Sequence, residues 1–256
     1  ALLNIAASGS NNIQLETNSS TRMTIKSDGD IEVGGNLKTN NLPGRNLIIN
    51  GSMICSQRST SKAITGAGYH VVDRFQTVAN SSMSYAVTMS QETDGPTGFE
   101  KCVKLLTTTA STPSGSENYI LRTNIEAGTI RQLGWGTSGS KVAVLSFWVK
   151  SNKTGTYTSQ IYIKGQSSTA TMTAAYTISS SATWEKKTIS IPAYTTSLAM
   201  KTNHTDNGCS IDWGLASGPD DITSAFSWTT STSAKAVTGQ VNLLDTINNY
   251  WQVTGI

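Results

Sequence analysis

Residues 141–164 read KVAVLSFWVK, SNKTG and TYTSQIYIK in succession. A strand that is apolar on both faces is normally covered on both, so the first part predicts a central strand of a packed sheet. Residues 152–155 supply a polar turn ending in glycine, and residues 157, 159, 161 and 163 predict one face of a returning strand. We therefore predict a β-hairpin in the middle of a β-sandwich. The apolar residues of the first strand are Leu145, Phe147 and Val149 on one face and Val142, Val144 and Trp148 on the other.

Length and composition indicate a β-rich globular chain. Its 256 residues suffice for one large β domain and a smaller unit. Only 14% of the residues are charged and the net charge is +3, so nothing points to nucleic acid or to an anionic membrane surface. Frequent Ser, Thr and Gly favour strands and turns. Six Trp and eight Tyr argue against a disordered chain.

The cysteines and the N-terminal segment exclude several protein classes. Cys55, Cys102 and Cys209 lie far apart, without a CxxC motif or clustered histidines, which predicts neither a disulfide framework nor a zinc site. We expect three free, mostly buried thiols, and no metal or cofactor. The apolar start at residues 1–10 is too short for a signal peptide or membrane span, so no membrane insertion is expected. We expect the natural protein to continue beyond the apolar strand that ends at Ile256.

Residues 1–40 differ in pattern from the rest of the chain. Apolar residues recur in pairs spaced by two, with turn-forming Ser, Asn, Asp and Gly between them, in a repeat of roughly eight to ten residues. A segment of about forty residues rarely folds alone. Several chains that wind together would cover each other's edges, so we predict an intertwined, homotrimeric β-repeat stalk. The alternative is a disordered, Ser-rich leader. The pairs are Leu3/Ile5, Ile13/Leu15, Met23/Ile25 and Ile31/Val33.

A linker at residues 41–45 precedes a second domain at 46–256. Pro43 and Gly44 break any strand there, and Asn50 with Gly51 predicts a turn soon after. Short strands separated by polar turns predict an antiparallel jelly-roll β-sandwich, with an immunoglobulin-like sandwich as the alternative. Besides 141–164, the predicted strands are 69–78, 84–89, 102–107, 119–125, 171–178, 184–191, 198–200 with 210–215, 235–244 and 250–256.

Several stretches of this chain resemble a known family. They are NNIQLETNSSTRMTIKSDGDIEVGGN (11–36), GRNLIINGSMICSQRSTS (44–61), VVDRF (71–75), LSFWVKSNKTGTY (145–157), TWEKKTISIP (183–192) and SAKAVTGQVNLLDTINNYWQVTGI (233–256). In combination they resemble tail fibres and related virion proteins of tailed bacteriophages, many of them from cyanobacterial and marine phages. The resemblance implies a trimeric virion fibre whose head is a carbohydrate-binding-module-like jelly roll. It implies no defined catalytic site.

Candidate catalytic and metal-binding groups are weak. Glycan hydrolysis needs two carboxylates ~5–10 Å apart on a rigid face, and no acidic pair stands out on a predicted strand. His70 and His204 lie far apart, without a nucleophile motif, so we expect no enzyme activity. The oxygen-rich loops at 206–208 and 218–221 could hold Ca²⁺, but we interpret both as ordinary turns.

Aromatic residues are the best candidates for a binding surface, because sugars stack their C–H faces on exposed rings. Trp135, Trp213 and Trp228 lie near Gly- and Ser-rich turns and are the predicted ligand-binding residues. The alternative for all three is packing in the core or at a trimer interface. Trp148 and Trp184 lie within strand patterns, and we expect both in the core.

Three functions are compatible with these sequence features. In the first, the trimeric fibre is an adhesin that attaches the virion to host surface polysaccharide, three weak sites combining into stable attachment. In the second, it is a structural fibre on the tail or capsid that binds only other virion proteins. The third is a glycan depolymerase. Clustered solvent-facing aromatic residues would favour the first, and a convergent carboxylate pair would favour the third.

Overall fold

The computed structural model describes residues 11–17, 19–27, 31–33, 46–79, 83–233 and 235–256. The chain divides into two compact units, Ala1–Asn46 and Leu47–Ile256. The predicted linker at 41–45 and the apolar pair Leu3/Ile5 lie outside the described residues. The predicted domain boundaries therefore stay a prediction.

The first unit contains an antiparallel three-stranded sheet in the order β1-β2-β3. Ile13 pairs with Ile25, and Ile25 pairs with Ile31, so residues of the predicted apolar pairs lie opposite each other. Leu15 and Ile31 are nevertheless 48% and 60% exposed. One copy of this sheet leaves apolar side chains uncovered. The strands are β1 (Ile13–Thr17), β2 (Ser20–Ile25) and β3 (Ile31–Val33).

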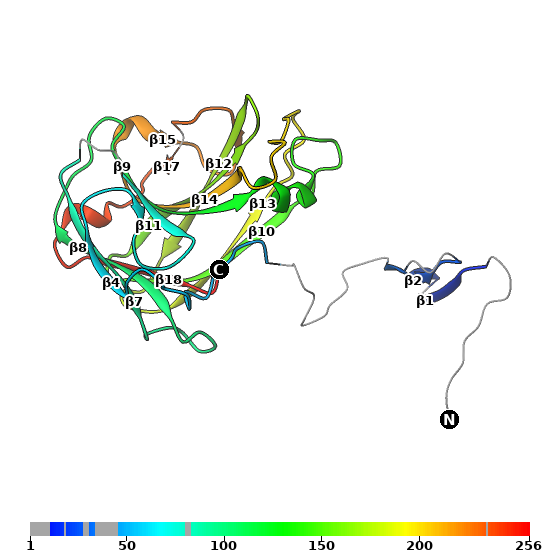
Figure 1. Ribbon diagram of the computed structural model, residues 1–256, viewed down its shortest axis with the longest axis horizontal. Coiled ribbons are helices and arrows are strands. Elements are labelled where there is room, and N and C mark those ends of the chain that lie inside the picture. The colour runs from blue at the N-terminus through cyan, green and yellow to red at the C-terminus, as the bar shows by residue number, and fades with distance from the viewer. Residues whose placement is uncertain (1–10, 18, 28–30, 34–45, 80–82, 234) are drawn as a thin grey trace. The chain divides into compact units, whose positions relative to one another are not determined.

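The second unit is a sandwich of two antiparallel sheets, which Figure 1 shows packed face to face. The six-stranded sheet has the order β13-β10-β18-β8-β7-β4, and the seven-stranded sheet has the order β16-β12-β11-β14-β9-β6-β5. The predicted jelly-roll β-sandwich is confirmed, whereas the intertwining of the stalk stays a prediction. The strands of the six-stranded sheet are β4 (Ser61–Ile64), β7 (Ala86–Glu92), β8 (Cys102–Thr109), β10 (Ala143–Ser151), β13 (Glu185–Ile191) and β18 (Tyr250–Thr254). Those of the seven-stranded sheet are β5 (Gly68–Tyr69), β6 (Phe75–Ala79), β9 (Asn118–Glu126), β11 (Gly155–Lys164), β12 (Thr169–Ile178), β14 (Asn207–Ser217) and β16 (Trp228–Thr229).

Smaller elements lie in the connections. A two-stranded parallel ladder joins β15 to β17. Among the described residues no helix is longer than 4 residues. The elements are α1 (Ala127–Ile130), η1 (Arg131–Leu133), η2 (Pro219–Asp221), β15 (Ile222–Thr223), β17 (Ala236–Val237) and η3 (Leu243–Asp245).

Aromatic side chains from both sheets meet in the core. Phe147 of β10 lies edge-on to Trp213 of β14, with ring centroids 5.7 Å apart, and edge-on to Tyr176 of β12 at 5.1 Å. Tyr176 in turn stacks on Tyr157 of β11, and Trp213 contacts Phe75 of β6. Alternation along each strand points these residues inward. Contacts of this kind between the sheets fix how the two layers pack.

The predicted hairpin at 141–164 is wrong. Both of its strands exist, but β10 pairs with β13 and β18, whereas β11 pairs with β12 and β14. The turn at 152–154 therefore carries the chain from one sheet to the other. The hydroxyl of Ser151 contacts the Tyr157 hydroxyl at 3.2 Å and donates to the Tyr250 carbonyl. Alternation of apolar and polar residues predicts strands but not which strands pair. A connection that crosses to the other sheet and a turn within one sheet give the same sequence pattern.

The prediction that the first of these strands is covered on both faces is also wrong. β10 lies inside its sheet, and Leu145, Phe147 and Val149 face the core. On the opposite face, however, Val142 and Val144 are 69% and 66% exposed. The six-stranded sheet therefore has an uncovered apolar strip beside its edge strand β13.

Three other predicted strands are shorter than expected. Residues 69–78 form two strands, because the segment between β5 and β6 turns and Arg74 adopts a φ of +74°. Residues 235–244 keep only β17, since Gly239 has a φ of +81° and η3 follows. Residues 198–200 contribute a single bridge between Met200 and Gly165. Local turn geometry interrupts each pattern that the sequence presents as continuous.

The cysteines agree with expectation in being free, with Cys102 and Cys209 buried and Cys55 exposed. Within the part of the chain that the structure describes, no helix has the length and hydropathy needed to span a membrane.

Candidate functional site

The three predicted ligand-binding tryptophans differ in where they lie. Trp213 is completely buried between the sheets, and Trp135 is 3% exposed with its indole N–H donating to the Lys141 carbonyl at 2.8 Å. For these two rings the structure agrees with the alternative of packing in the core, because their apolar surfaces lie inside the sandwich. Trp228 on β16 is partly exposed and packs against Trp135 and Tyr194 at centroid distances of 5.8 and 5.1 Å. Its role in ligand binding stays a prediction.

Trp148 and Trp184 also differ from expectation, since neither lies in the core. Both are partly exposed on the six-stranded sheet. The Trp184 ring lies beneath the Lys150 ammonium, 5.0 Å from its centroid, and its N–H donates to the Asp94 carbonyl. Asp94 forms an ion pair with Lys150 that holds the pKa of its carboxyl below the usual range. The contacts among Trp184, Lys150 and Asp94 join neighbouring segments on the surface of this sheet, and Lys150 covers one face of the indole.

The outer side of the seven-stranded sheet carries a connected group of polar side chains. Along β9, β14 and β11, core-facing residues such as Leu121 and Ile211 alternate with residues that point away from the core. Cross-strand pairing aligns these residues in rows, as in the triplet Tyr162, Ser210 and Asn124. We call this group the polar face. It consists of Tyr69, Arg122, Asn124, Tyr162, Lys164, Asn207, Ser210 and Asp212.

A bidentate ion pair lies at the centre of the polar face. Arg122 donates from Nε to one oxygen of Asp212 at 2.7 Å, and from a terminal nitrogen to the other at 2.6 Å. Asp212 is 1% exposed, and this burial raises the pKa of its carboxyl, while the bonds from Arg122 oppose that rise. The Arg122 side chain is 17% exposed, and the ion pair fixes the plane of its guanidinium at the surface.

A second network ties an exposed aromatic ring to this face. Tyr69 is 41% exposed, and its hydroxyl accepts a hydrogen bond from the Asn124 amide at 3.1 Å. The Asn124 oxygen accepts from Ser210 at 2.7 Å and from Asn207 at 2.8 Å. Buried Ser210 thus orients a partly exposed amide, and that amide orients the tyrosine.

Arg58 contacts the ring of the same tyrosine. Its guanidinium lies 5.7 Å from the Tyr69 ring centroid and forms an ion pair with Asp73 at 2.6 Å. The ring is therefore held by a hydroxyl contact at one end and a cation at its side. Such an aromatic side chain loses little freedom when a ligand stacks on it.

Tyr162 and Lys164 on β11 complete the polar face. The Lys164 ammonium lies 5.0 Å from the centroid of the Tyr162 ring. Burial lowers the pKa of Lys164, and the neighbouring charge of Arg122 lowers it further. In the described part of the chain no carboxylate lies within salt-bridge distance of this ammonium. Its N–H groups remain available to a ligand.

Residues 218–233 and 235–241 form a segment that covers the far part of the same sheet surface. Phe226 donates its backbone N–H to the Thr173 carbonyl at 2.6 Å, and Val237 donates to the Thr158 hydroxyl at 3.0 Å. Asp221, a fully buried residue of this segment, accepts hydrogen bonds from Lys235 and from Asn118. This segment therefore forms one boundary of the polar face, and Tyr69 lies on the strand at the opposite edge of the sheet.

The chemistry available on the polar face is hydrogen bonding and stacking. Asp212 has both oxygens occupied by Arg122, which leaves no free oxygen for general acid or base catalysis. No cluster of three or more metal-binding side chains occurs among the residues that the structure describes. The accessible groups are two phenol rings, an amide, a guanidinium and an ammonium, which together suit a polar ligand with both donors and acceptors.

Comparisons with known proteins give distant structural likeness alone. No family model matches the sequence, and no curated protein matches it. A structure described as "CBM4 structure and function" has a TM-score of 0.35 and 12% identity, over 80% of this chain and 94% of that one. A family 11 carbohydrate-binding module from Clostridium thermocellum, in complex with a mixed-linked tetrasaccharide, has a TM-score of 0.35 and 10% identity, over 76% and 95%. The CBM22-2 xylan-binding domain from Paenibacillus barcinonensis has a TM-score of 0.35 and 12% identity, over 70% and 91%. TM-scores this low say nothing about what the present chain binds.

Sequence reasoning missed the residues of the polar face. One local signal was present: in 118–126 and 207–217, charged and amide residues alternate with large apolar ones, as on a strand with a polar outer side. That signal places Arg122 and Asp212 on outer faces. It cannot show that strands 90 residues apart lie side by side.

Proposed function

We propose that this protein binds hydroxyl-rich glycans at the polar face and leaves them chemically unchanged. The observation that carries the proposal is the exposed Tyr69 ring, whose hydroxyl is joined through Asn124 to a partly buried polar network. Sugars present flat C–H surfaces that stack on aromatic rings, and hydroxyls that need both donors and acceptors. Tyr69 and Tyr162 supply the rings, and Asn124, Arg122 and Lys164 supply the polar groups.

Binding is favoured over catalysis by the state of the carboxylates. A glycosidase needs one carboxyl group that gives a proton and one that attacks or activates water. On the polar face Asp212 is held by Arg122, and Glu126 at the end of β9 is held by Arg74. These carboxylates serve to orient cations. A depolymerase is therefore the weakest of the three functions considered.

We extend the proposal to a homotrimeric virion fibre that attaches a phage to host surface polysaccharide. The support is the sequence resemblance together with the exposed apolar residues of the first unit, Leu15 and Ile31. A three-stranded sheet with uncovered apolar side chains is marginal alone, and winding with two further copies would bury them. In a trimer three heads act on one surface, so weak single-site affinities combine.

A glycan array probed with the full chain tests the binding proposal. We expect binding of a subset of polysaccharides, loss of binding in Tyr69→Ala, and retained binding in Tyr69→Phe, which keeps the ring. Thermal unfolding of each variant checks that the fold is intact. Trp228→Ala is measured alongside, and unchanged binding removes that residue as a ligand contact. An array without any bound glycan contradicts the proposal.

Light scattering tests the fibre proposal. We expect the mass of a trimer for the full chain and a smaller mass after deletion of residues 1–44, because the stalk supplies the contacts. A trimer that survives the deletion moves the interface into the sandwich. A monomeric full chain overturns the intertwined stalk, and the binding proposal for the head is unaffected.

A specific observation favours a second candidate, a structural role in assembly. Val142 and Val144 expose an apolar strip on the six-stranded sheet, and such surfaces often pack against other proteins. Replacing both valines with serine in the full chain tests this role. Loss of self-association or of binding to other virion proteins, in a chain that binds no glycan, would favour assembly over adhesion.

A further inference from the structure

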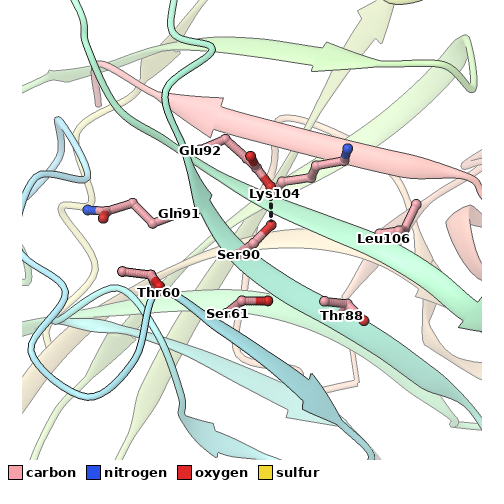
Figure 2. Close-up of a pocket in the computed structure, with 8 residues that line it drawn as sticks. All are labelled: Thr60, Ser61, Thr88, Ser90, Gln91, Glu92, Lys104 and Leu106. Carbon is pink, nitrogen blue, oxygen red and sulfur yellow. Dashed lines mark hydrogen bonds between the residues drawn. The ribbon is translucent and has the colours of Figure 1, made fainter.

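A second polar surface lies on the other sheet of the sandwich, facing away from the polar face. There β4, β7 and β8 line a hollow of about 340 Å³ that is open to solvent, and its volume is within the size range of small-ligand sites. Figure 2 shows the lining residues on these three neighbouring strands, with Thr60 just before β4. Its lining is Thr60, Ser61, Thr88, Ser90, Gln91, Glu92, Lys104 and Leu106.

Cross-strand register explains why hydroxyl groups gather in this hollow. Ser61 of β4 pairs with Ser90 of β7, and Ser90 pairs with Lys104 of β8. In the next row Thr88 pairs with Leu106. All of these side chains point to the same outer side, because residues two apart share a face of a strand. The rows place hydroxyls beside one ammonium and one apolar side chain.

Several polar groups of the hollow have no hydrogen-bond partner among the described residues, although the Gln91 amide donates to the Met53 and Ile54 carbonyls. Glu92 accepts a hydrogen bond from the Ser90 hydroxyl at 2.5 Å through one oxygen, which Figure 2 marks with a dashed line. The other oxygen of Glu92 and the hydroxyls of Ser61 and Thr88 bind no protein group within the described part of the chain. The Lys104 ammonium lies 4.9 Å from the Tyr250 ring centroid and, among the described residues, forms no salt bridge.

The balance of these groups selects a class of ligand. One carboxylate and one ammonium cancel in charge, so the hollow favours a neutral molecule over an ion. Free hydroxyls, a carboxylate oxygen and an ammonium suit a ligand that both donates and accepts through several hydroxyls. Leu106, with the Tyr250 ring nearby, offers apolar contact for C–H groups. The volume accommodates a ring the size of one sugar residue.

We infer that this hollow is a second carbohydrate site, which binds a single neutral sugar residue independently of the polar face. Lys104 and Glu92 bind vicinal hydroxyls, and Thr88 and Ser61 bind the hydroxyl groups at the other side of the ring. The two sites lie on the outer sides of opposite sheets, so neither depends on occupancy of the other.

Nuclear magnetic resonance titration of the full chain tests this inference. The probes are the methyl glycosides of glucose, galactose, mannose and xylose, together with N-acetylglucosamine. We expect at least one to shift the backbone amides of Ser61, Thr88, Ser90 and Lys104 in a saturable manner. Shifts at Asn124 and Tyr162 report the polar face separately, so failure of one site is distinguishable from failure of the other.

Two variants and a matched control complete the test. Thr88→Val removes one hydroxyl at nearly constant volume and is expected to weaken binding about fivefold, as for one lost hydrogen bond. Lys104→Met keeps the stem and is expected to weaken binding at least as much. The control is Thr188→Val, at an exposed position of β13 in the same sheet, and we expect no change. Absence of shifts with every probe, or equal affinity in all three variants, overturns the inference.

Discussion

Arg122 and Asp212 lie 90 residues apart in the sequence and pair in register on neighbouring strands, with two hydrogen bonds of 2.7 and 2.6 Å between them. The pair joins β9 to β14 on the surface where we propose that glycans bind. A buried carboxylate fixes the guanidinium there, so the site is held in place before a ligand arrives. Preorganised polar groups lose less entropy on binding.

Removing the arginine should cost more than removing the whole pair. In Arg122→Gln the buried Asp212 loses its counter-charge, and we expect a loss of about 3–5 kcal/mol in the free energy of unfolding. In Arg122→Leu combined with Asp212→Leu, we expect recovery of most of this loss. Urea denaturation of the wild type, the single variant and the double variant measures these differences in the free energy of unfolding. Equal losses in the single and double variants would show that the pair contributes by packing alone.

The same variant should depend on pH in a defined direction. Burial raises the pKa of Asp212, and in Arg122→Gln no bond from arginine opposes that rise. A carboxyl whose pKa is higher in the folded than in the unfolded state binds protons more tightly when folded, so the variant gains stability as pH falls. We expect its deficit relative to wild type to be smaller at about pH 5 than at about pH 8. A deficit that grows on acidification contradicts this assignment.

Alkaline pH should destabilise the sandwich through its buried tyrosines. Burial raises the pKa of Tyr157 to about 12, above the value of about 10 expected in the unfolded chain. The folded state therefore keeps a proton that the unfolded state releases, and the stability is lost as pH rises from about 10 towards 12. Melting temperatures over this range, with tyrosinate absorbance, measure the effect. We expect a shallower decline in Tyr157→Phe than in wild type.

Trp213 should behave as a core residue and not as a ligand contact. It packs against Phe147 and Phe75 with no exposed surface, so Trp213→Ala is expected to cost about 3–5 kcal/mol of unfolding free energy. Trp228→Ala, which removes a partly exposed ring, should cost clearly less. Chemical denaturation compares the two. A Trp213→Ala protein with wild-type stability would contradict the described core.

The turn between the sheets should tolerate no side chain at Gly155. Its φ is +128°, and an added Cβ would lie 2.5 Å from the Cγ1 atom of Val241. We expect Gly155→Ala to lose roughly 1–3 kcal/mol of stability from backbone strain, with the clash adding to it. Gly66→Ala is the matched control, because nothing lies within 4 Å of a Cβ there. Equal stability of the two variants would contradict the backbone conformation described at Gly155, where the chain enters β11 after crossing from the other sheet.

The fold class was predictable from local pattern, whereas strand partners were not. Alternation along 143–151 and 155–164 predicts both strands correctly, because side-chain direction in a strand depends on neighbouring residues alone. Whether the chain then turns back or crosses to the other sheet depends on contacts such as Phe147 with Trp213. Those residues are distant in sequence, and the alternation along each strand does not show which other strand it pairs with.

The residues of the candidate site were likewise not predictable from local sequence pattern. Glycine and serine near Trp135 and Trp213 favour exposed turns, yet Trp135 lies in a turn with its ring packed inward, and Trp213 lies within β14 on the side that faces the core. Tyr69 lies in a two-residue strand, which is too short for the sequence to show which side its ring faces. Its importance comes from the Asn124 amide that binds its hydroxyl, a contact across 55 residues of sequence.

Calorimetric titration of the full chain with the glycan that binds best on the array tests the central claim most directly. We expect Tyr69→Ala to weaken binding about tenfold or more, because it removes the stacking ring, and Thr188→Val on the opposite sheet to leave the affinity unchanged. Wild-type affinity in a folded Tyr69→Ala protein would contradict glycan binding at the polar face.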